Sequence, residues 1–175
     1  FTEAKILLAK TQMALQNYDG AISVLREIPN PASAGIEKDL AAAYFYNSQF
    51  SESAPILQRY LADHPSDTEA RLMLAHAFHY GGQIREAVRL YEDLQAGVLP
   101  ESPAVEGELG EISLQKGDYE AAIAHYRKVL VNTPGNTKAR LRLAGLLSWI
   151  KEYGESIEEY RKVLETDRDS FQARM

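Results

Sequence analysis

The sequence predicts an all-α protein built from repeated helix pairs, and three observations support this prediction. The segment that starts at Asp118 returns 34 residues later, starting at Glu152. Similar landmarks recur along the whole chain of 175 residues and divide it into five repeats. No stretch shows the apolar–polar alternation that is typical of a strand. A period near 34 residues indicates a two-helix unit stacked on copies of itself, so we expect ten helices of about 11–15 residues each.

The landmarks predict a single array over residues 1–175. The five complete repeats span residues 2–33, 34–67, 68–102, 103–136 and 137–170, and a sixth repeat begins at 171–175. Each repeat in such an array contacts only its neighbours, so the array is stabilised one interface at a time. Because the sixth repeat is incomplete, we expect the chain to belong to a longer array.

Two landmarks define the helices of each pair. Every second helix is predicted to begin at a bulky residue: Tyr18, Phe50, Ile84, Tyr119 and Tyr153. A small residue follows three places later: Ala21, Ser53, Ala87, Ala122 and Ser156. Every first helix carries a large residue followed by a small one: Leu8-Ala9, Leu40-Ala41, Leu74-Ala75, Leu109-Gly110 and Leu143-Ala144. Small side chains at these places allow the two helix backbones to approach closely.

Turn and cap residues fit the same division. A proline, which cannot continue a helix, follows four of the second helices: Pro31, Pro65, Pro100 and Pro134. Glycines with expected positive φ separate first from second helices: Gly81, Gly82 and Gly117. Side chains suited to cap the start of a first helix stand at Asp67, Ser102 and Asn136.

These landmarks resemble the tetratricopeptide repeat. The repeat at 103–136 carries the family's pattern at Leu109, Gly110, Gly117, Tyr119, Ala122, Tyr126 and Pro134. The opening aromatic place of the family departs from the pattern and holds Lys5, Glu37, Arg71, Glu106 and Arg140. The resemblance implies a right-handed α-solenoid whose concave groove is lined by first helices. It also implies a scaffold that holds a protein or peptide partner in that groove.

The resemblance places the groove at the second, fifth, ninth, twelfth and thirteenth positions of each repeat. Its strongest candidates here are Lys10, Phe45, Tyr46, His76, His79, Tyr80, Glu111 and Trp149. Aromatic side chains at the middle of a concave face are good anchors for a partner. We expect Tyr46, His79 and Tyr80 to be exposed, because they lie at the ends of their helices. Phe45 and Trp149 are equally compatible with packing between neighbouring helices.

No motif in the sequence predicts catalysis. The chain has neither a phosphate-binding Gly-rich loop, nor a nucleophile elbow, nor a His-Glu-x-x-His run, and it contains no cysteine. His76 and His79 are suitably spaced to share a metal ion, but no third ligand accompanies them. We therefore expect no catalytic residues, no metal and no cofactor, and we expect His64 and His125 to be ordinary surface residues.

Charge and hydropathy limit the partner classes. The net charge of −6 argues against binding to a nucleic-acid backbone or an anionic membrane surface. No apolar run approaches the length of about 20 residues that spans a bilayer, so this segment is not expected to insert into a membrane. A protein or peptide partner is the favoured interpretation. Self-association and a regulatory role beside an attached enzyme are the alternatives.

A second resemblance concerns the last complete repeat. Residues 140–149, followed by Tyr153 and by Glu159-Tyr160-Arg161-Lys162-Val163-Leu164, are similar to repeats in bacterial exopolysaccharide export proteins. In those proteins a periplasmic tetratricopeptide region precedes an outer-membrane barrel. The resemblance implies a bacterial envelope setting, with the periplasm favoured and the cytoplasm as the alternative.

Overall fold

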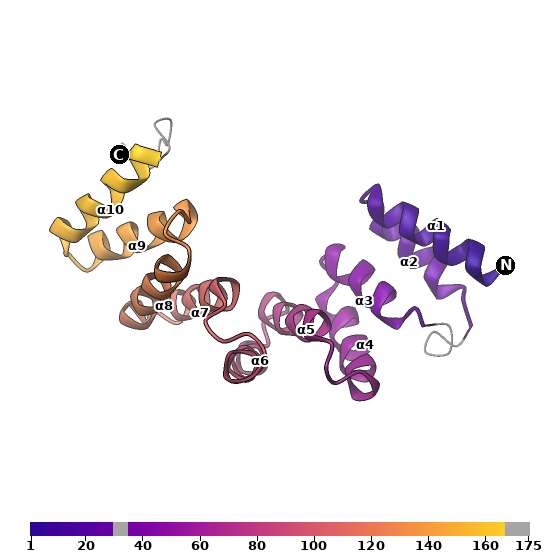
Figure 1. Ribbon diagram of the computed structural model, residues 1–175. Helices are drawn as coiled ribbons and strands as arrows, with labels where there is room; N and C mark the ends of the chain where they lie inside the picture. Colours follow the sequence, from indigo (N-terminus) through magenta and orange to yellow (C-terminus); the bar gives the residue numbers. More distant parts are fainter. Residues whose placement is uncertain (30–34, 167–175) are drawn as a thin grey trace. The chain divides into compact units, whose positions relative to one another are not determined.

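The computed structural model describes residues 1–29 and 35–166, and these residues form ten α-helices and no strand (Figure 1). The first helices of the pairs are α1 (Thr2–Ala14), α3 (Glu37–Tyr46), α5 (Thr68–Tyr80), α7 (Pro103–Gln115) and α9 (Thr137–Trp149). The second helices are α2 (Tyr18–Arg26), α4 (Phe50–Asp63), α6 (Ile84–Ala96), α8 (Tyr119–Asn132) and α10 (Tyr153–Thr166). The predicted all-α fold is therefore confirmed. Pro31 and the start of the sixth repeat at 171–175 lie outside the described residues.

The chain forms two compact blocks, an N-terminal block (Phe1–Leu94) and a C-terminal block (Gln95–Met175). In the N-terminal block α1, α2, α3, α4 and α5 pack in chain order, each on the next. In the C-terminal block α7, α8, α9 and α10 pack in the same way, and Figure 1 shows each pair as two adjacent helices of similar colour. Helix α6 runs across the boundary between the blocks. Because each helix contacts its chain neighbours, the core of each block is a chain of local interfaces.

Helix lengths depart from expectation only in the first two repeats. Helix α2 has 9 residues and α3 has 10, which is shorter than predicted, whereas the other eight described helices have 13 or 14. The second helices begin at the bulky residues that the sequence predicts. Asp67, Ser102 and Asn136 are the caps of α5, α7 and α9, although the Ser102 side chain makes no cap hydrogen bond.

The turn inside each pair has the same three-residue geometry in all five described pairs. Its middle residue has positive φ in every case: Gln16, Ser48, Gly82, Gly117 and Lys151. The N–H of the third residue donates to a carbonyl five residues earlier, as from Asn17 to Gln12 and from Glu152 to Leu147. This pattern is a Schellman motif, which satisfies the last carbonyls of the first helix. Gly81 was expected to share the positive φ but has φ −79°, because it lies at the helix end before the left-handed residue.

The small residues of the second helices lie where the two helices of a pair meet. All five are at most 3% exposed: Ala21, Ser53, Ala87, Ala122 and Ser156. Where the other repeats have the methyl group of alanine, the two serines have a hydroxyl that makes a hydrogen bond to the first helix. Ser53 Oγ donates to the carbonyl oxygen of Ala41, and Ser156 Oγ donates to that of Ala144, both at 2.8 Å. The serine and alanine repeats therefore use the same close crossing, with no buried hydroxyl left unsatisfied at these two positions.

In four repeats the charged residue at the family's opening aromatic place forms an ion pair with the second helix of its own repeat or with the residue that ends it. Lys5 Nζ lies 2.8 Å from Glu27 Oε2. Arg59 Nε lies 2.5 Å from Glu37 Oε1, so the sign of the charge at this place is reversed in the second repeat. The departure from the family pattern thus replaces an aromatic contact with a salt bridge and leaves the helix pair intact.

The C-terminal block uses the same arrangement, with carboxylates that are buried like that of Glu37. Glu106 lies 2.6 Å from His125 Nδ1 and 3.2 Å from Lys128 Nζ, and Arg140 pairs with Glu159. Burial opposes ionisation of Glu106, but its contacts with His125 and Lys128 outweigh that effect and lower its pKa below the ordinary value. The expectation that His125 is an ordinary surface residue is wrong, because the Glu106 carboxylate holds its ring against the helix pair.

Enlarging a crossing residue is expected to destabilise the protein. Ala122→Leu should lower the free energy of unfolding by about 1–3 kcal/mol or more, because the extra atoms have no space between α7 and α8. Ala124→Leu on the exposed face of α8 is the matched control and should change it by less than about 0.5 kcal/mol. Urea unfolding followed by circular dichroism measures both, and equal effects would show that the crossing is not tightly packed.

The sign of φ should decide the effect of glycine in the turns. Lys151 has φ 70°, whereas the equally exposed Lys116 has φ −78°. Lys151→Gly should raise the free energy of unfolding by about 0.5–1 kcal/mol, because glycine adopts positive φ without steric cost. Lys116→Gly should lower it by a similar amount, because glycine has more conformational freedom in the unfolded chain. Thermal unfolding of both variants tests this, and a change of the same sign in both would contradict it.

Candidate functional site

An aromatic cluster lies in the N-terminal block, and Phe45 is at its centre. The centroid of the Phe45 ring lies 5.4 Å from that of Tyr46, 5.5 Å from Phe50, 6.3 Å from His76 and 6.5 Å from Tyr80. Tyr18 stacks on Tyr46 at 5.7 Å and completes the cluster. We use the name aromatic cluster for these six residues. Phe45 is half-buried among the other rings, so it packs between helices as well as occupying a predicted groove position.

The aromatic contacts follow the repeat. The first residue of a second helix contacts the thirteenth residue of the next repeat in three places. These contacts are Tyr18 with Tyr46 at 5.7 Å, Phe50 with Tyr80 at 5.6 Å and Tyr119 with Trp149 at 6.3 Å. The sequence analysis used the opening residues of the second helices only as boundaries. Their aromatic character was the available signal that they also support the predicted groove residues.

Exposure separates the predicted groove residues of the N-terminal block. Tyr46 and Tyr80 are 53% and 51% exposed, as expected, and His76 is half-buried between them and the core. His79 is only 5% exposed, so the expectation of an exposed side chain is wrong. It follows the fully buried Ala75 by one helical turn and therefore shares the buried stripe of α5, although it lies near the helix end. Its ring stacks on Tyr80 at 5.0 Å and supports that side chain.

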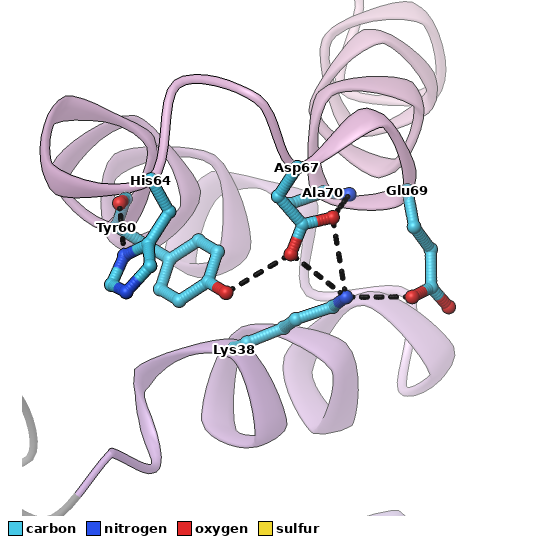
Figure 2. A network of polar contacts seen from close by, with 6 residues as sticks. All are labelled: Lys38, Tyr60, His64, Asp67, Glu69 and Ala70. Carbon is cyan, nitrogen blue, oxygen red and sulfur yellow. Dashed lines mark hydrogen bonds and ion pairs between the residues drawn. The ribbon is translucent and has the colours of Figure 1, made fainter.

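A polar network joins the second and third repeats, and Figure 2 shows the Lys38 amine, the Tyr60 hydroxyl and the Ala70 N–H converging on the Asp67 carboxylate. Asp67 Oδ1 accepts from the N–H of Ala70 at 3.0 Å. Lys38 Nζ donates to Asp67 Oδ2 at 3.0 Å and to Glu69 at 2.6 Å. The Tyr60 hydroxyl donates to Asp67 Oδ2 at 3.0 Å. The network therefore ties α3 and α4 to the start of α5.

The Asp67 carboxylate is strongly stabilised in its ionised form. The hydrogen bond from the Ala70 N–H, together with those from Lys38 and Tyr60, outweighs partial burial and lowers the pKa of Asp67 from 3.8 to about 2. Burial and the hydrogen bond to Asp67 raise the pKa of Tyr60. Lys10, at the predicted groove edge, is exposed, and its Nζ lies 3.9 Å from Asp39 Oδ2. Carboxylates therefore offset part of the positive charge of both lysines.

The predicted groove residues of the C-terminal block lie beside a hollow. Trp149 is 72% exposed, so for this residue packing between helices is ruled out. Glu111 Oε1 accepts from Arg142 Nε at 3.0 Å. The hollow has a volume of about 310 Å³, and the residues that line it are Leu114, Tyr119, Leu141, Arg142, Gly145, Leu146 and Trp149. The block therefore combines an exposed indole, an apolar floor and an ion pair at the rim.

A larger hollow of about 600 Å³ lies in the N-terminal block, and none of the predicted groove residues is among the residues that line it. Ser48, Ser51, Gln58, Gln83 and Glu86 supply its polar lining, and Phe50 belongs both to its wall and to the aromatic cluster. Sequence analysis had no signal for this hollow, because its residues come from the ends of three helices and share no repeat position.

Two searches of the described residues bear on ligand class. Within residues 1–29 and 35–166, no three histidine or carboxylate side chains lie close enough together to hold a metal ion. In the same residues, no helix combines the length and apolar character needed to span a membrane.

Comparison with known families identifies the repeat. A family model described as Tetratricopeptide repeat matches residues 38–79 and 72–137, and a second model with the same description matches residues 113–175. Together with the helix pairs and their turns, these matches define the class: the chain belongs to the tetratricopeptide repeat family, whose members are scaffolds for protein–protein interaction.

Particular relatives cover the chain in different ways. Cellulose synthase operon protein C of Pseudomonas fluorescens (strain SBW25) is 30% identical over 122 residues, which are 66% of this chain and 10% of that protein. BBSome complex member BBS4 of Bos taurus is 26% identical over 157 residues, which are 90% of this chain and 29% of that protein. The chain therefore spans a tenth and less than a third of the lengths of these two relatives.

Solved structures of MamA have the same fold. One crystal structure of MamA superposes with a TM-score of 0.78 at 17% identity and covers 99% of this chain and 96% of that chain. MamA from Desulfovibrio magneticus RS-1 superposes with a TM-score of 0.80 at 15% identity, with 97% of each chain covered. At these identities the likeness concerns the fold alone.

Neutralising Asp67 should remove a pH-dependent part of the stability. A folded pKa of about 2, below the ordinary 3.8, means that ionised Asp67 stabilises the fold above about pH 4, and that this contribution is lost as the pH falls towards 2. Asp67→Asn should lower the free energy of unfolding by about 2 kcal/mol at pH 7, and the difference from the wild type should shrink between about pH 4 and pH 2. Urea unfolding across this pH range measures the difference.

A position without the lysine offers a matched control for Asp67→Asn. Asn136, the cap of α9, occupies the equivalent place and accepts from the Ala139 N–H at 3.0 Å, so asparagine retains the helix cap. The place of Lys38 is taken there by Gly107. Asn136→Asp should therefore show a smaller pH dependence than Asp67, because it gains only the bond from the helix N–H, whereas Lys38 and Tyr60 add to that bond at Asp67. An equal pH dependence at the two positions would contradict the role of the Lys38–Asp67 ion pair.

Proposed function

We propose that this chain is a non-catalytic binding scaffold that holds a partner protein against the aromatic cluster of its N-terminal block. The observation that carries the proposal is the half-exposure of Tyr46 and Tyr80 on either side of the half-buried Phe45. Large aromatic side chains contribute much of the binding free energy at protein interfaces. Here two of them remain half-exposed on packed helices. The aromatic residues lie at positions where the resemblance to the family predicts the groove.

Preorganisation supports a binding role for these tyrosines. Tyr46 stacks on Tyr18, and Tyr80 is held by Phe50, His76 and His79 through ring centroids 5.0–6.0 Å apart. Because neighbouring side chains already fix both rings, a partner would lose little side-chain entropy by ordering them. The proposed contact residues are Lys10, Phe45, Tyr46, His76 and Tyr80, with Glu111 and Trp149 in the C-terminal block.

The charges around the aromatic cluster suggest the character of the partner segment. Lys10 is exposed, and Lys38 lies among carboxylates that offset its charge. An apolar or aromatic segment with a modest number of polar side chains fits this surface better than a highly charged one. Such a segment would gain from burial against the tyrosines without leaving charges unpaired.

The cellular setting belongs to the same proposal. The similarity to a cellulose synthase operon protein, together with the resemblance of residues 140–164 to exopolysaccharide export repeats, supports a role in bacterial exopolysaccharide export. The chain would then be part of a larger envelope protein, with the periplasm as its favoured location. Its partner would be an enzyme or subunit of the export machinery.

Photo-cross-linking tests the proposed contact surface. A benzophenone amino acid placed at Tyr46 or Tyr80 of the parent protein in its native bacterium should cross-link to the same envelope protein. Placed at Val131, which is exposed on a second helix, it should not. Cross-linked products are identified by mass spectrometry. Cross-linking from all three positions alike would indicate nonspecific encounters and argue against the assignment.

The affinity of the identified partner provides the quantitative test. Tyr46→Ala/Tyr80→Ala should weaken binding at least about tenfold, because both anchors are removed. Val131→Ala should leave the affinity unchanged. Calorimetry with the purified partner measures the dissociation constants, and circular dichroism checks that each variant is folded. An affinity unchanged by the double substitution would rule out this groove assignment.

A further inference from the structure

Trp149 differs from the other aromatic residues at the thirteenth position of a repeat. Tyr46 and Tyr80 belong to a cluster of six rings, whereas within the described residues the Trp149 ring contacts one other ring, that of Tyr119. The indole is 72% exposed and is the only tryptophan of the chain. Its large apolar face is therefore presented to solvent beside the hollow of about 310 Å³. An exposed aromatic surface of this kind marks a binding site more often than a packing position.

Gly145 contributes backbone and no side chain to the lining of the hollow. This glycine precedes Trp149 by one turn of α9 and lines the hollow. A Cβ at this position would make only ordinary contact, at 3.7 Å from Tyr160 Oη, so packing does not require glycine here. Glycine in the interior of a helix costs about 1 kcal/mol relative to alanine. The glycine therefore leaves the hollow wider than alanine would at the same helix position.

The polar rim of the hollow carries a charge pair that is already balanced. Arg142 lines the hollow and donates from Nε to Glu111 at 3.0 Å. A charged ligand would have to compete with this existing partner, so the rim favours neither an anion nor a cation. A guanidinium has five N–H donors and a carboxylate has several lone pairs, so the pair retains capacity for uncharged hydroxyl groups.

We propose that this hollow binds an uncharged carbohydrate chain. One pyranose ring would stack its C–H face on the exposed face of the Trp149 indole, and its hydroxyl groups would bond to Arg142 and Glu111. A flat exposed ring, an apolar lining and a neutral donor–acceptor pair match the two kinds of surface that a pyranose presents.

This inference goes beyond the proposed function, because it gives the C-terminal block a ligand of a different class from the partner of the N-terminal block. The residues that line the hollow all lie within the C-terminal block, residues 95–175. The carbohydrate site can therefore fail while the protein-binding proposal stands, and the reverse also holds.

The single tryptophan provides a direct readout for the test. The fluorescence of the 175-residue chain is titrated with cellohexaose and with maltohexaose, which are uncharged and differ in linkage. We expect a saturable change in Trp149 emission with at least one of them. No saturable change with either sugar at millimolar concentration would overturn the proposal. A saturable response only to an acidic peptide rich in leucine and phenylalanine would also overturn it and assign the hollow to a peptide.

Variants separate the site from general effects on the fold. Arg142→Met should weaken sugar binding at least about tenfold, because it removes the rim donors while Trp149 remains as the reporter. Gly145→Ala should weaken binding several-fold by narrowing the hollow while it stabilises α9. Tyr46→Ala/Tyr80→Ala in the other block should bind the sugar as the wild type does. Equal affinity in Arg142→Met and the wild type, with both folded by circular dichroism, would refute the proposed site.

Discussion

The close crossing of two helices at one small residue is the constraint on which the rest of the structure depends. At Ala122, as at Ser53, no side chain larger than two heavy atoms beyond Cα separates the second helix from the first. Because the two helices lie so close together, a turn of only three residues can connect them. Such a turn requires one residue with positive φ. It also brings side chains at the helix openings within reach of the partner helix, which makes the ion pairs of Glu37 and Arg140 geometrically available. A bulkier crossing residue would disturb the turn and the ion pair together.

The repeat keeps the backbone similar while surface residues vary, and this gives the two blocks different aromatic surfaces. The thirteenth position holds Tyr46 and Tyr80 in the N-terminal block and Trp149 in the C-terminal block. The tyrosines gain neighbours from His76 and Phe50 and become a preorganised cluster. Trp149 has glycine one turn before it and becomes the open wall of a hollow. Differences in neighbouring side chains, with the helices unchanged, therefore determine what each surface is suited to bind.

The sequence predicted those features that depend on signals within one repeat. Helix starts such as Tyr119, buried small residues such as Ala122 and caps such as Asp67 follow from residue type and local spacing. The burial of His79 depends on which stripe of α5 faces the neighbouring helices, and proximity to the helix end gave the wrong answer. The convergence of Lys38 and Tyr60 on Asp67 depends on three-dimensional contacts among α3, α4 and the start of α5, which residue spacing along the chain does not contain. The positive φ of Ser48 could not be predicted, because its turn contains no glycine that would indicate it.

The ion pairs at the opening positions have a consequence for how similar repeats find their own partners. Along each block the sign of the charge reverses from one repeat to the next: Lys5 pairs with Glu27 and Glu37 with Arg59, then Glu106 with Lys128 and Arg140 with Glu159. If two neighbouring repeats exchanged their second helices during folding, lysine would face arginine and glutamate would face glutamate. Arrays of similar sequence are prone to this kind of misassembly. The alternation of charge therefore makes the exchanged pairing electrostatically unfavourable, so that two nearly interchangeable helices are distinguished by a single residue in each.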